Sequence, residues 1–386
     1  MIAANIATVF SAIGVAQAAA GWIVVGRFAG RKRGTLPNVV MPVSVLKPLH
    51  GDEPLLEAAL ASVCRQDYPT WQVVFGVQDP EDSSLPVVRR LQAQYRQCDI
   101  AVVVDPIGHG RNRKVANLIN MLPAAKHDVL VIADSDVHVS PDWLRRLVSA
   151  LEAPGVGLVT TVYTGLPANG LHPPAPSREG REAGTVGALG AMQINHYFLP
   201  GALLARAMGR EDCLGASMML RRETLERIGG LPTLVDHLAD DNVLGRLVRR
   251  LGLRVALADT VPATTVPETT LRALWRHELR WARTIRTLVP VQFGASVLQY
   301  PLAWAIVTVA LTAAAPWALG WFAVGWAARA AAARGIDRAL GLANRTPLWL
   351  LPLRELMSVA VMLASYAGRQ VDWRGHTLQA EGFDPR

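Results

Sequence analysis

Long apolar stretches lie near both ends of the chain, and a different pattern fills the middle. Residues 2–26 and residues 291–328 contain no charged side chain. A helix that crosses a bilayer needs about 20 mainly apolar residues, so each stretch is long enough to span a membrane. We expect one N-terminal anchor and, because Pro301 and Pro316 interrupt the second stretch, a helical hairpin.

The flanking charges predict how these stretches are oriented. No basic residue precedes the first stretch, and four follow it directly: Arg27, Arg31, Lys32 and Arg33. This favours an uncleaved anchor with a cytoplasmic basic flank over a signal peptide, although "AQAAAG" resembles a cleavage site. The arginines beyond residue 328 favour the hairpin, because they indicate a return to the cytoplasm.

A third apolar stretch, residues 347–368, differs because it contains Arg354 and Glu355. Charged side chains at the depth of a bilayer are costly. We therefore expect this stretch to be re-entrant, interfacial or packed against the other helices, with a cytoplasmic tail after it.

Between the apolar ends, short β-branched runs alternate with helical stretches. The predicted strands are "VVMPVSVLKP", "QVVFGV", "IAVVVD", "DVLVIAD" and "VGLVTTVY". This rhythm predicts an α/β domain with a parallel or mixed sheet that helices cover on both faces. The helix after the fourth strand is expected to begin with Ser140 as its N-cap.

The pattern changes after the fifth strand. Residues 165–184 are rich in proline and glycine and are expected to form a surface loop. Residues 186–207 are mostly apolar, carry His196 and are broken by Pro200. This segment is expected to lie on the membrane or to cover an acceptor site.

The composition is also typical of a membrane protein. Hydrophobic residues make up 51% of the chain and charged residues only 18%, below the roughly 25% of soluble domains. The net charge of +8 is compatible with nucleic acid, but arginines beside membrane stretches explain it more simply. Cys64, Cys98 and Cys213 are isolated, which argues against a disulfide framework or a zinc site.

Acidic residues follow the predicted strands, where ligands bind in such sheets. In "IADSDVHV", Asp134, Asp136 and His138 alternate, so an extended chain would place all three on one side. Two carboxylates at this spacing suit Mg²⁺ or Mn²⁺ that also grips a diphosphate, because these ions prefer oxygen ligands. The same pattern also occurs in turns and helix caps, and a lone histidine such as His138 is more often solvated or in the core.

The segment "GHGRNRKVANL" suggests an anion site. It places Gly108, Gly110, Asn112 and Lys114 in a loop that leads into a helix. Glycines let the backbone approach a phosphate, and a helix N-terminus with a lysine attracts anions. The pattern GxxxxGK[ST] is missing, which argues against a P-loop ATPase.

Two later segments add a base and positive charge. In "HLADDN", Asp240 is interpreted as a helix cap and Asp241 as a general base that takes a proton from a hydroxyl. The next helix is basic and amphipathic, which is typical of a helix on a lipid surface. Alternatively, its His277, Arg280 and Trp281 cover a diphosphate and stabilise its charge.

In this order, the segments resemble the membrane-bound family-2-like glycosyltransferases with a GT-A fold, in particular the ceramide glucosyltransferase family (glycosyltransferase family 21). The nearest likeness within it is to the bacterial hopanoid-biosynthesis-associated glycosyltransferases. Nine segments spread over nearly the whole chain carry the resemblance: "SVLKPLHGDEP", "DYPTWQVVFGVQDPED", "GRNRKVANL", "IADSDVHV", "LGASMMLRRETLERIGGL", "HLADDN", "HELRW", "LRELMS" and "WRG".

The resemblance implies a role for each matching residue. Asp79 corresponds to the family's first aspartate, near the uracil or ribose of a UDP-sugar, with Pro48 and Lys114 beside it. Asp134 corresponds to the second aspartate, near the diphosphate and the metal. Asp241 corresponds to the third, the base.

Three further positions are less uniform. His196 corresponds to a family histidine on the acceptor side. The closing motif is usually (Q/R)xxRW and here begins with His277, which leaves the role of that position open but retains Arg280 and Trp281. Ceramide-type members often lack the second aspartate of DxD, whereas Asp136 is present, so metal binding is easier to argue here.

The implied fold is α/β, with a GT-A-type mixed sheet flanked by helices, an N-terminal transmembrane helix and a C-terminal membrane region. The expected domains are an anchor (1–30), a cytoplasmic catalytic domain (36–268), an interfacial amphipathic helix with HxxRW (269–289), membrane helices (290–368) and a cytoplasmic tail (369–386).

We therefore expect an inverting lipid glycosyltransferase of the bacterial inner membrane, with its catalytic domain facing the cytoplasm. The subfamily likeness implies UDP-N-acetylglucosamine as donor and a hopanoid such as bacteriohopanetetrol as acceptor. A UDP-glucose-dependent ceramide or sphingolipid glucosyltransferase is the alternative. A processive polysaccharide synthase needs more spanning helices. A transporter would not need the α/β domain in the middle of the chain. A membrane-tethered nucleic-acid or lipid-binding module would give the acidic residues at the strand ends no role.

Overall fold

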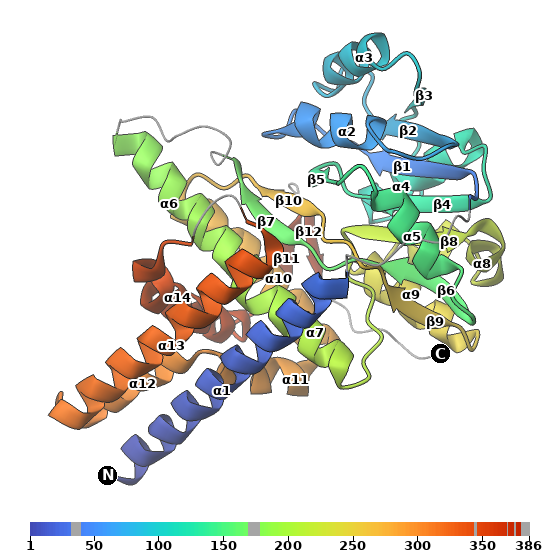
Figure 1. Ribbon diagram of the computed structural model, residues 1–386. Helices are drawn as coiled ribbons and strands as arrows, with labels where there is room; N and C mark the ends of the chain where they lie inside the picture. The colour runs from blue at the N-terminus through green and yellow to red at the C-terminus, as the bar shows by residue number, and fades with distance from the viewer. Residues whose placement is uncertain (32–39, 169–177, 343–345, 369, 374–375, 380–386) are drawn as a thin grey trace. The chain divides into compact units, whose positions relative to one another are not determined.

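The computed structural model describes residues 1–31, 40–168, 178–342, 346–368, 370–373 and 376–379. The chain divides into two compact units. The sheet unit comprises Arg31–Ala168 and Met208–Pro267, and the helical unit comprises Met1–Gly30, Asn169–Ala207 and Glu268–Arg386. Figure 1 shows the elements of both units.

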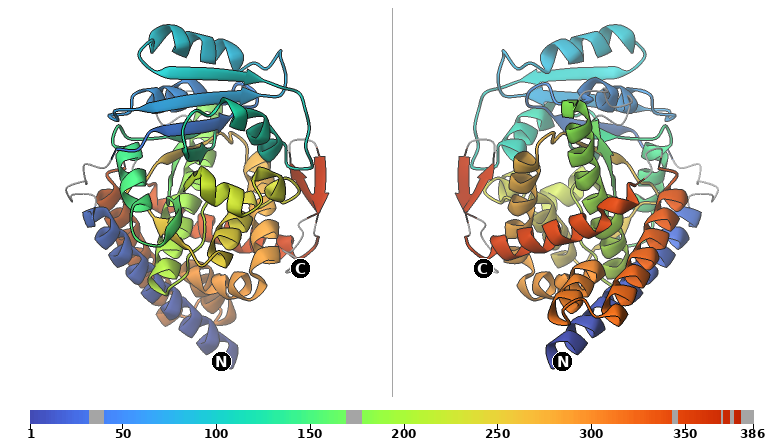
Figure 2. Two further views of the ribbon diagram at one scale, coloured as in Figure 1. Left: turned by 90° about the vertical axis from the view of Figure 1, so that its right-hand side faces the viewer. Right: turned by 90° about the vertical axis from the view of Figure 1, so that its left-hand side faces the viewer.

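A seven-stranded sheet forms the sheet unit, in the order β3-β2-β1-β4-β8-β6-β9. Its strands are β1 (Val43–Pro48), β2 (Trp71–Val77), β3 (Asp99–Val104), β4 (Val129–Ala133), β6 (Val156–Thr160), β8 (Ser217–Arg221) and β9 (Arg254–Leu257). The first four pair in parallel, and β8 runs antiparallel to both β4 and β6. The views in Figure 2 show β1, β2 and β3 side by side at one edge. The sequence pattern did not predict β8.

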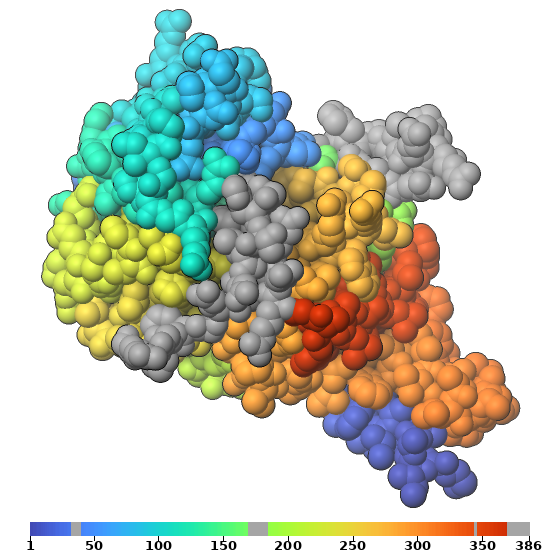
Figure 3. Space-filling model, turned by 180° about the vertical axis from the view of Figure 1, so that it is seen from behind, coloured from blue at the N-terminus to red at the C-terminus, as the bar shows by residue number. Residues whose placement is uncertain are grey.

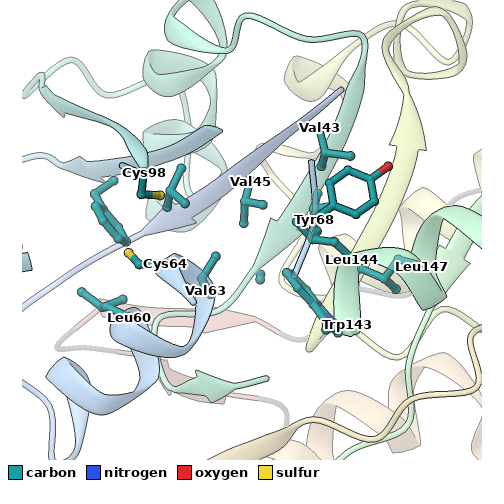
Figure 4. Close-up of a cluster of buried hydrophobic side chains, with 14 of the residues drawn as sticks. Val43, Val45, Leu60, Val63, Cys64, Tyr68, Cys98, Trp143, Leu144 and Leu147 are labelled. Carbon is teal, nitrogen blue, oxygen red and sulfur yellow. The ribbon is translucent and has the colours of Figure 1, made fainter. Parts of the chain in front are cut away.

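Helices pack on this sheet because their apolar sides match its β-branched faces. They are α2 (Leu56–Cys64), α3 (Leu85–Gln94), α4 (Arg113–Met121), α5 (Trp143–Leu151), α8 (Arg222–Arg227) and α9 (Asp240–Arg250), with short turns η1 (Leu122–Ala124) and η4 (Leu231–Leu234). Val43 and Val45, at alternate positions of β1, lie in one buried cluster with Leu60 of α2 and Trp143 and Leu144 of α5 (Figure 4). The predicted mixed sheet flanked by helices is confirmed.

Three short strands form a second small sheet in the same unit. They are β5 (Val137–His138), β10 (Ala263–Val266) and β7 (Thr164–Pro167), with β10 in the middle. Part of the region predicted as a surface loop, residues 165–184, therefore belongs to β7. Another part belongs to α6 (Arg178–Gln193), and residues 169–177 lie outside the described residues.

Two predictions about helix ends are wrong. α5 begins at Trp143 after Asp142, and the Ser140 hydroxyl donates to the Asp142 carboxylate instead of capping the helix. This local bond competes with the cap. Pro200 does not end its helix, because α6 continues through a π-helical turn, η3 (Ile194–Phe198), into α7 (Leu199–Ala207). A widened turn tolerates the missing N–H of a proline.

The helical unit contains the long apolar helices. They are α1 (Ile2–Arg31), α10 (Leu271–Leu288), α11 (Pro290–Ala295), η5 (Ser296–Gln299), α12 (Pro301–Leu311), α13 (Pro316–Leu340), η6 (Leu348–Leu350) and α14 (Leu351–Ser365). Two strands, β11 (Gln370–Trp373) and β12 (His376–Gln379), pair near the C-terminus. Pro301 and Pro316 each occupy the first position of a helix, where a proline costs no hydrogen bond.

The N-terminal helix packs closely on α12 and α13 (Figure 3). The Ser11 hydroxyl donates to the Pro301 carbonyl at 2.9 Å and accepts from the Trp321 indole N–H at 3.0 Å. A Cβ at Gly14 would lie 2.5 Å from the Leu298 carbonyl oxygen, so only glycine allows this approach. Small and hydroxyl side chains of this kind are typical of helix contacts in membranes.

Within the described residues, two helical segments are long and apolar enough to cross a membrane, Ile2–Arg31 and Leu348–Ser365. The pair Pro290–Gln299 and Pro301–Leu311, bent by 67°, is a further candidate. These segments indicate that the protein associates with a membrane. Arg354 and Glu355 lie in the second segment, but both side chains are completely buried within the protein.

Candidate active site

Three parallel strands of the sheet unit end at one edge, and a predicted site residue lies at each end. Pro48 ends β1, Asp79 follows β2 and Asp134 follows β4. Parallel strands bring their carboxyl ends together, and ligands bind there. Asp79 is exposed, and its carboxylate accepts a hydrogen bond from the Glu81 N–H at 2.9 Å.

The segment "IADSDVHV" does not stay extended, contrary to the prediction. β4 ends at Ala133, and the N–H of Val137 bonds to the carbonyl of Asp134 at 3.3 Å, which closes a turn before β5. Asp136 lies in this turn and accepts a hydrogen bond from the Thr264 hydroxyl. His138 belongs to β5, so the three side chains do not share the face of one strand.

Lys47 holds this turn, and the sequence analysis did not single it out. Its ammonium is buried and donates to the carbonyls of Asp134 (2.8 Å) and Val137 (3.2 Å). Burial lowers the pKa of Lys47 to about 8, although the charges of Asp136 and Asp134 oppose the shift. A lysine inside the apolar run "VSVLKP" is the signal that the sequence offers. Backbone carbonyls bent around a cation explain why the chain turns here.

Lys114 joins the end of β4 to the start of α9. Its Nζ lies 2.7 Å from Asp134 Oδ1 and 3.4 Å from Asp240 Oδ2. Burial opposes the charged form, but Asp134 and Asp240 outweigh it and raise the pKa of Lys114. The interpretation of Asp240 as a cap is wrong, because Ala239 is the N-cap and Asp240 pairs with Lys114.

Asn112 helps to hold Lys114 in its position between β4 and α9. It is the buried N-cap of α4 and accepts a hydrogen bond from the Val115 N–H at 3.2 Å. Its amide donates to the His237 carbonyl at 2.8 Å. These bonds fix the helix that carries Lys114 and tie it to the segment before α9.

Asp241 follows Asp240 and is partly buried. Burial and the neighbouring charge of Asp240 raise the pKa of Asp241 to about 7. Gly215 covers the carboxylate: it has a φ of +82°, and a Cβ there would lie 2.7 Å from Asp241 Oδ2. A residue other than glycine would displace the acid, a role that "LGAS" alone did not reveal.

Tyr163 lies close to three of the predicted acids, Asp241, Asp134 and Asp136. It follows β6 and is buried. Burial, together with the charges of Asp241, Asp134 and Asp136, raises the pKa of Tyr163. The ends of β4 and β6 and the start of α9 thus meet in one acidic centre, with the buried Lys47 and the half-buried Lys114 as its cations.

The acidic centre fits a divalent cation that a substrate also binds. Among the described residues, no three His, Cys, Asp or Glu side chains are arranged to hold a metal by themselves. Burial and the charge of Asp134 raise the pKa of Asp136 to about 6, so negative charge is not fully compensated there. Two carboxylates with substrate phosphates are a common ligand set for Mg²⁺.

Comparison with known proteins agrees with the resemblance found in the sequence. The profile of "Glycosyl transferase family 21" matches residues 5–382. The chain belongs to this family.

Several curated proteins and solved structures resemble this family 21 chain, among them the following three. It is 33% identical over 132 residues to a ceramide glucosyltransferase of Komagataella phaffii, a match that covers 33% of the chain and 26% of that relative. It is 25% identical over 308 residues to an N-acetylglucosaminyltransferase of Rhizobium meliloti, and this match covers 71% of the chain and 67% of that relative. The solved structure is the mannosyltransferase PcManGT from Pyrobaculum calidifontis in complex with GDP-Man and Mn²⁺. It is 22% identical in sequence, the match covers 92% of this chain and 99% of PcManGT, and the TM-score is 0.49.

The HxxRW motif of this family 21 member lies on α10 of the helical unit. Nδ1 of His277 hydrogen-bonds to the Glu268 carboxylate, and its ring meets the Trp281 ring edge-on, with 4.9 Å between centroids. Positions i, i+3 and i+4 of a helix share one face, so Arg280 lies beside them. His277 is therefore held by its neighbours on both sides.

His196 lies in η3, also in the helical unit. Its Nε2 is 2.6 Å from Thr346 Oγ1 and 3.3 Å from Asp337 Oδ1, and the side chain is completely buried. Burial lowers the pKa of His196, although Asp337 opposes the shift. These contacts give His196 a place in the packing of the helices, and its link to an acceptor stays a prediction.

Proposed function

We propose that this family 21 protein is a membrane-associated glycosyltransferase that moves one sugar from a UDP-sugar to a lipid hydroxyl. The observation that carries the proposal is the Lys114 bridge. It holds the expected diphosphate residue, Asp134, and the segment of the expected base, Asp241, in one acidic centre at the ligand-binding edge of the sheet.

In the proposed reaction, Asp241 takes the proton of the acceptor hydroxyl. The hydroxyl oxygen forms a bond to the anomeric carbon, and the bond from that carbon to the diphosphate oxygen breaks. UDP leaves with the bonding electrons, and the configuration at the anomeric carbon inverts. A carboxyl with a pKa of about 7 suits this step, because a base works best with a pKa near the working pH.

The remaining residues act on the donor. Asp79 is proposed to bind the uracil or ribose, near Pro48, and Asp134 and Asp136 to hold Mg²⁺ or Mn²⁺. Such an ion neutralises charge on the diphosphate when bound. The part of His277, Arg280 and Trp281, to stabilise the departing diphosphate, stays a prediction from the family's motif.

For donor and acceptor, we propose UDP-N-acetylglucosamine and a hopanoid such as bacteriohopanetetrol, at the bacterial inner membrane with the sheet unit in the cytoplasm. The name of the Rhizobium relative supports an N-acetylglucosaminyl donor. The name of the Komagataella relative supports the alternative of UDP-glucose and ceramide.

The test incubates purified full-length protein with UDP-N-acetylglucosamine, UDP-glucose or UDP-galactose, a divalent cation, and a lipid extract to which bacteriohopanetetrol or ceramide is added. Mass spectrometry then identifies which lipid gains which sugar. A single glycolipid that forms only with a UDP-sugar is the expected result. Its absence with every donor and acceptor would refute the proposal.

Two variants make the test specific. Asp241→Asn removes the base and is expected to abolish turnover while UDP still binds. Asp128→Asn makes the same chemical change at an exposed carboxylate paired with Arg222 and is expected to keep full activity. Turnover by Asp241→Asn at the wild-type rate would remove Asp241 from the mechanism.

A further inference from the structure

We propose that Arg354 is a positioning residue for the HxxRW motif and that it acts through Glu278. The inference rests on the proposed function, in which His277, Arg280 and Trp281 act on the departing diphosphate. Glu278 lies within "HELRW" and Arg354 within "LRELMS". Neither takes part in the reaction as described above.

Glu278 and Arg354 form a bidentate ion pair between α10 and α14. Nη1 of Arg354 donates to Glu278 Oε1 at 2.6 Å, and Nη2 donates to Oε2 at 2.7 Å. The Arg354 side chain is completely buried, and the Glu278 side chain is 10% exposed. Two parallel N–H···O bonds fix the relative orientation of the groups as well as their distance.

The same guanidinium also reaches α6. Nη1 of Arg354 donates to the Leu189 carbonyl at 3.3 Å, and Nη2 donates to Ser358 Oγ at 3.0 Å. Ser358 in turn lies 3.1 Å from Gln193 Oε1. Arg354 therefore links three helices, α6, α10 and α14. Because α6 and α14 hold its guanidinium in place, Arg354 cannot move with Glu278 if α10 shifts.

The Glu278–Arg354 ion pair, here called the clamp, restricts the rotation of α10 about its own axis. Successive helix residues are about 100° apart, so Glu278 lies one step around the helix from His277. His277, Arg280 and Trp281 share one face, whereas Ala282 and the residues around it pack on α14. Any rotation of α10 that turns the HxxRW face must therefore break the bidentate pair.

A second buried ion pair of α14 provides a matched control. Glu355, next to Arg354, is also completely buried, and its Oε1 lies 3.2 Å from Nε of Arg329 on α13. Its Oε2 accepts the N–H of Leu302 on α12 at 2.6 Å. This pair resembles the first in burial and in location but joins α14 to other helices.

The experiment compares Glu278→Gln and Glu355→Gln in the purified full-length protein, with rates expressed per folded molecule. Glu278→Gln is expected to lower kcat about tenfold or more while KM for the UDP-sugar stays within about twofold, because misplacement by 1 Å costs up to about 100-fold. Glu355→Gln is expected to lower the yield of folded protein and to keep kcat within about twofold. Equal losses of kcat in both variants would overturn the proposal.

A double variant separates positioning from a general structural role. If Glu278 acts through the motif, Glu278→Gln combined with Arg280→Ala is expected to be no slower than Arg280→Ala alone. Independent effects would multiply instead. Multiplied losses would contradict the proposal.

A readout without turnover keeps this inference distinct from the proposed function. Hydrogen exchange of α10 peptides is expected to speed up in Glu278→Gln and to stay unchanged in Glu355→Gln. If the wild-type protein transfers no sugar, the proposed function fails, while unchanged exchange in Glu278→Gln would by itself refute the clamp.

Discussion

Replacing Gly215 by alanine is expected to displace the base and to leave the rest of the sheet unit folded. Alanine at a φ of +82° costs about 1–2 kcal/mol of folding free energy. In addition, its Cβ would lie 2.7 Å from Asp241 Oδ2, where ordinary contact begins at 3.4 Å. Relief of this contact moves the carboxylate, or the chain around it, by about 0.7 Å, the difference between those two distances.

The expected loss of activity follows from this displacement. Since misplacement by 1 Å costs up to about 100-fold in rate, a shift of this size predicts a kcat about 10- to 100-fold lower. Binding of UDP is expected to persist, because Asp79 and Asp134 are not touched. The measurements are initial rates of sugar transfer and the affinity for UDP.

Gly252→Ala is the control for strain alone. Gly252 has a φ of +77°, and a Cβ there would meet nothing within 4 Å. Both variants are expected to lower the melting temperature by similar amounts, and only Gly215→Ala should lose turnover. Wild-type turnover in Gly215→Ala, or an equal loss of turnover in Gly252→Ala, would refute the reasoning.

Three other predictions concern charge in the acidic centre. Since Asp241 has a raised pKa of about 7 and must be ionised to act as a base, kcat/KM should fall about tenfold for each pH unit below 7 and level off above it; a flat profile from pH 5 to 8 would contradict this. EDTA should abolish transfer and Mg²⁺ or Mn²⁺ restore it, with Asp136→Asn needing at least about tenfold more metal. Lys114→Met leaves Asp134 and Asp240 without their cation and should lower the free energy of unfolding by about 1 kcal/mol at pH 8, because the side chains are partly exposed and water screens the pairs. Denaturant titrations of the wild type and the variant at pH 8 measure the difference.

The sequence was informative wherever a local pattern determines the structure. The alternation of apolar runs predicted the mixed sheet and most of its helices, because burial on both faces demands such runs. Asp79 and Asp134 were expected at strand ends, and both lie at the same edge of the sheet. The length of the uncharged stretch at residues 2–26 was sufficient to predict the N-terminal apolar helix.

Features that depend on distant partners were missed. Lys47 is a lysine within a strand, and only the turn after β4 gives its buried ammonium acceptors. Asp240 has the sequence of a helix cap, but Lys114, from another part of the chain, changes its role. Gly215 matters through its distance to Asp241, which no sequence spacing contains. β8 escaped prediction because "SMMLR" has no alternation, and its place between β4 and β6 is set by tertiary pairing.

The position of β8 also bears on how the protein is made. β8 joins β3-β2-β1-β4 to β6-β9 in the centre of the sheet, yet it is synthesised after residues 169–207 of the helical unit. Until the ribosome has passed Arg221, the nascent chain carries β4 and β6 with open edges that face no partner strand. Late pairing between distant segments is slow, and open edges invite aggregation. The sheet unit is therefore expected to complete its hydrogen bonding only after Arg221 has been synthesised.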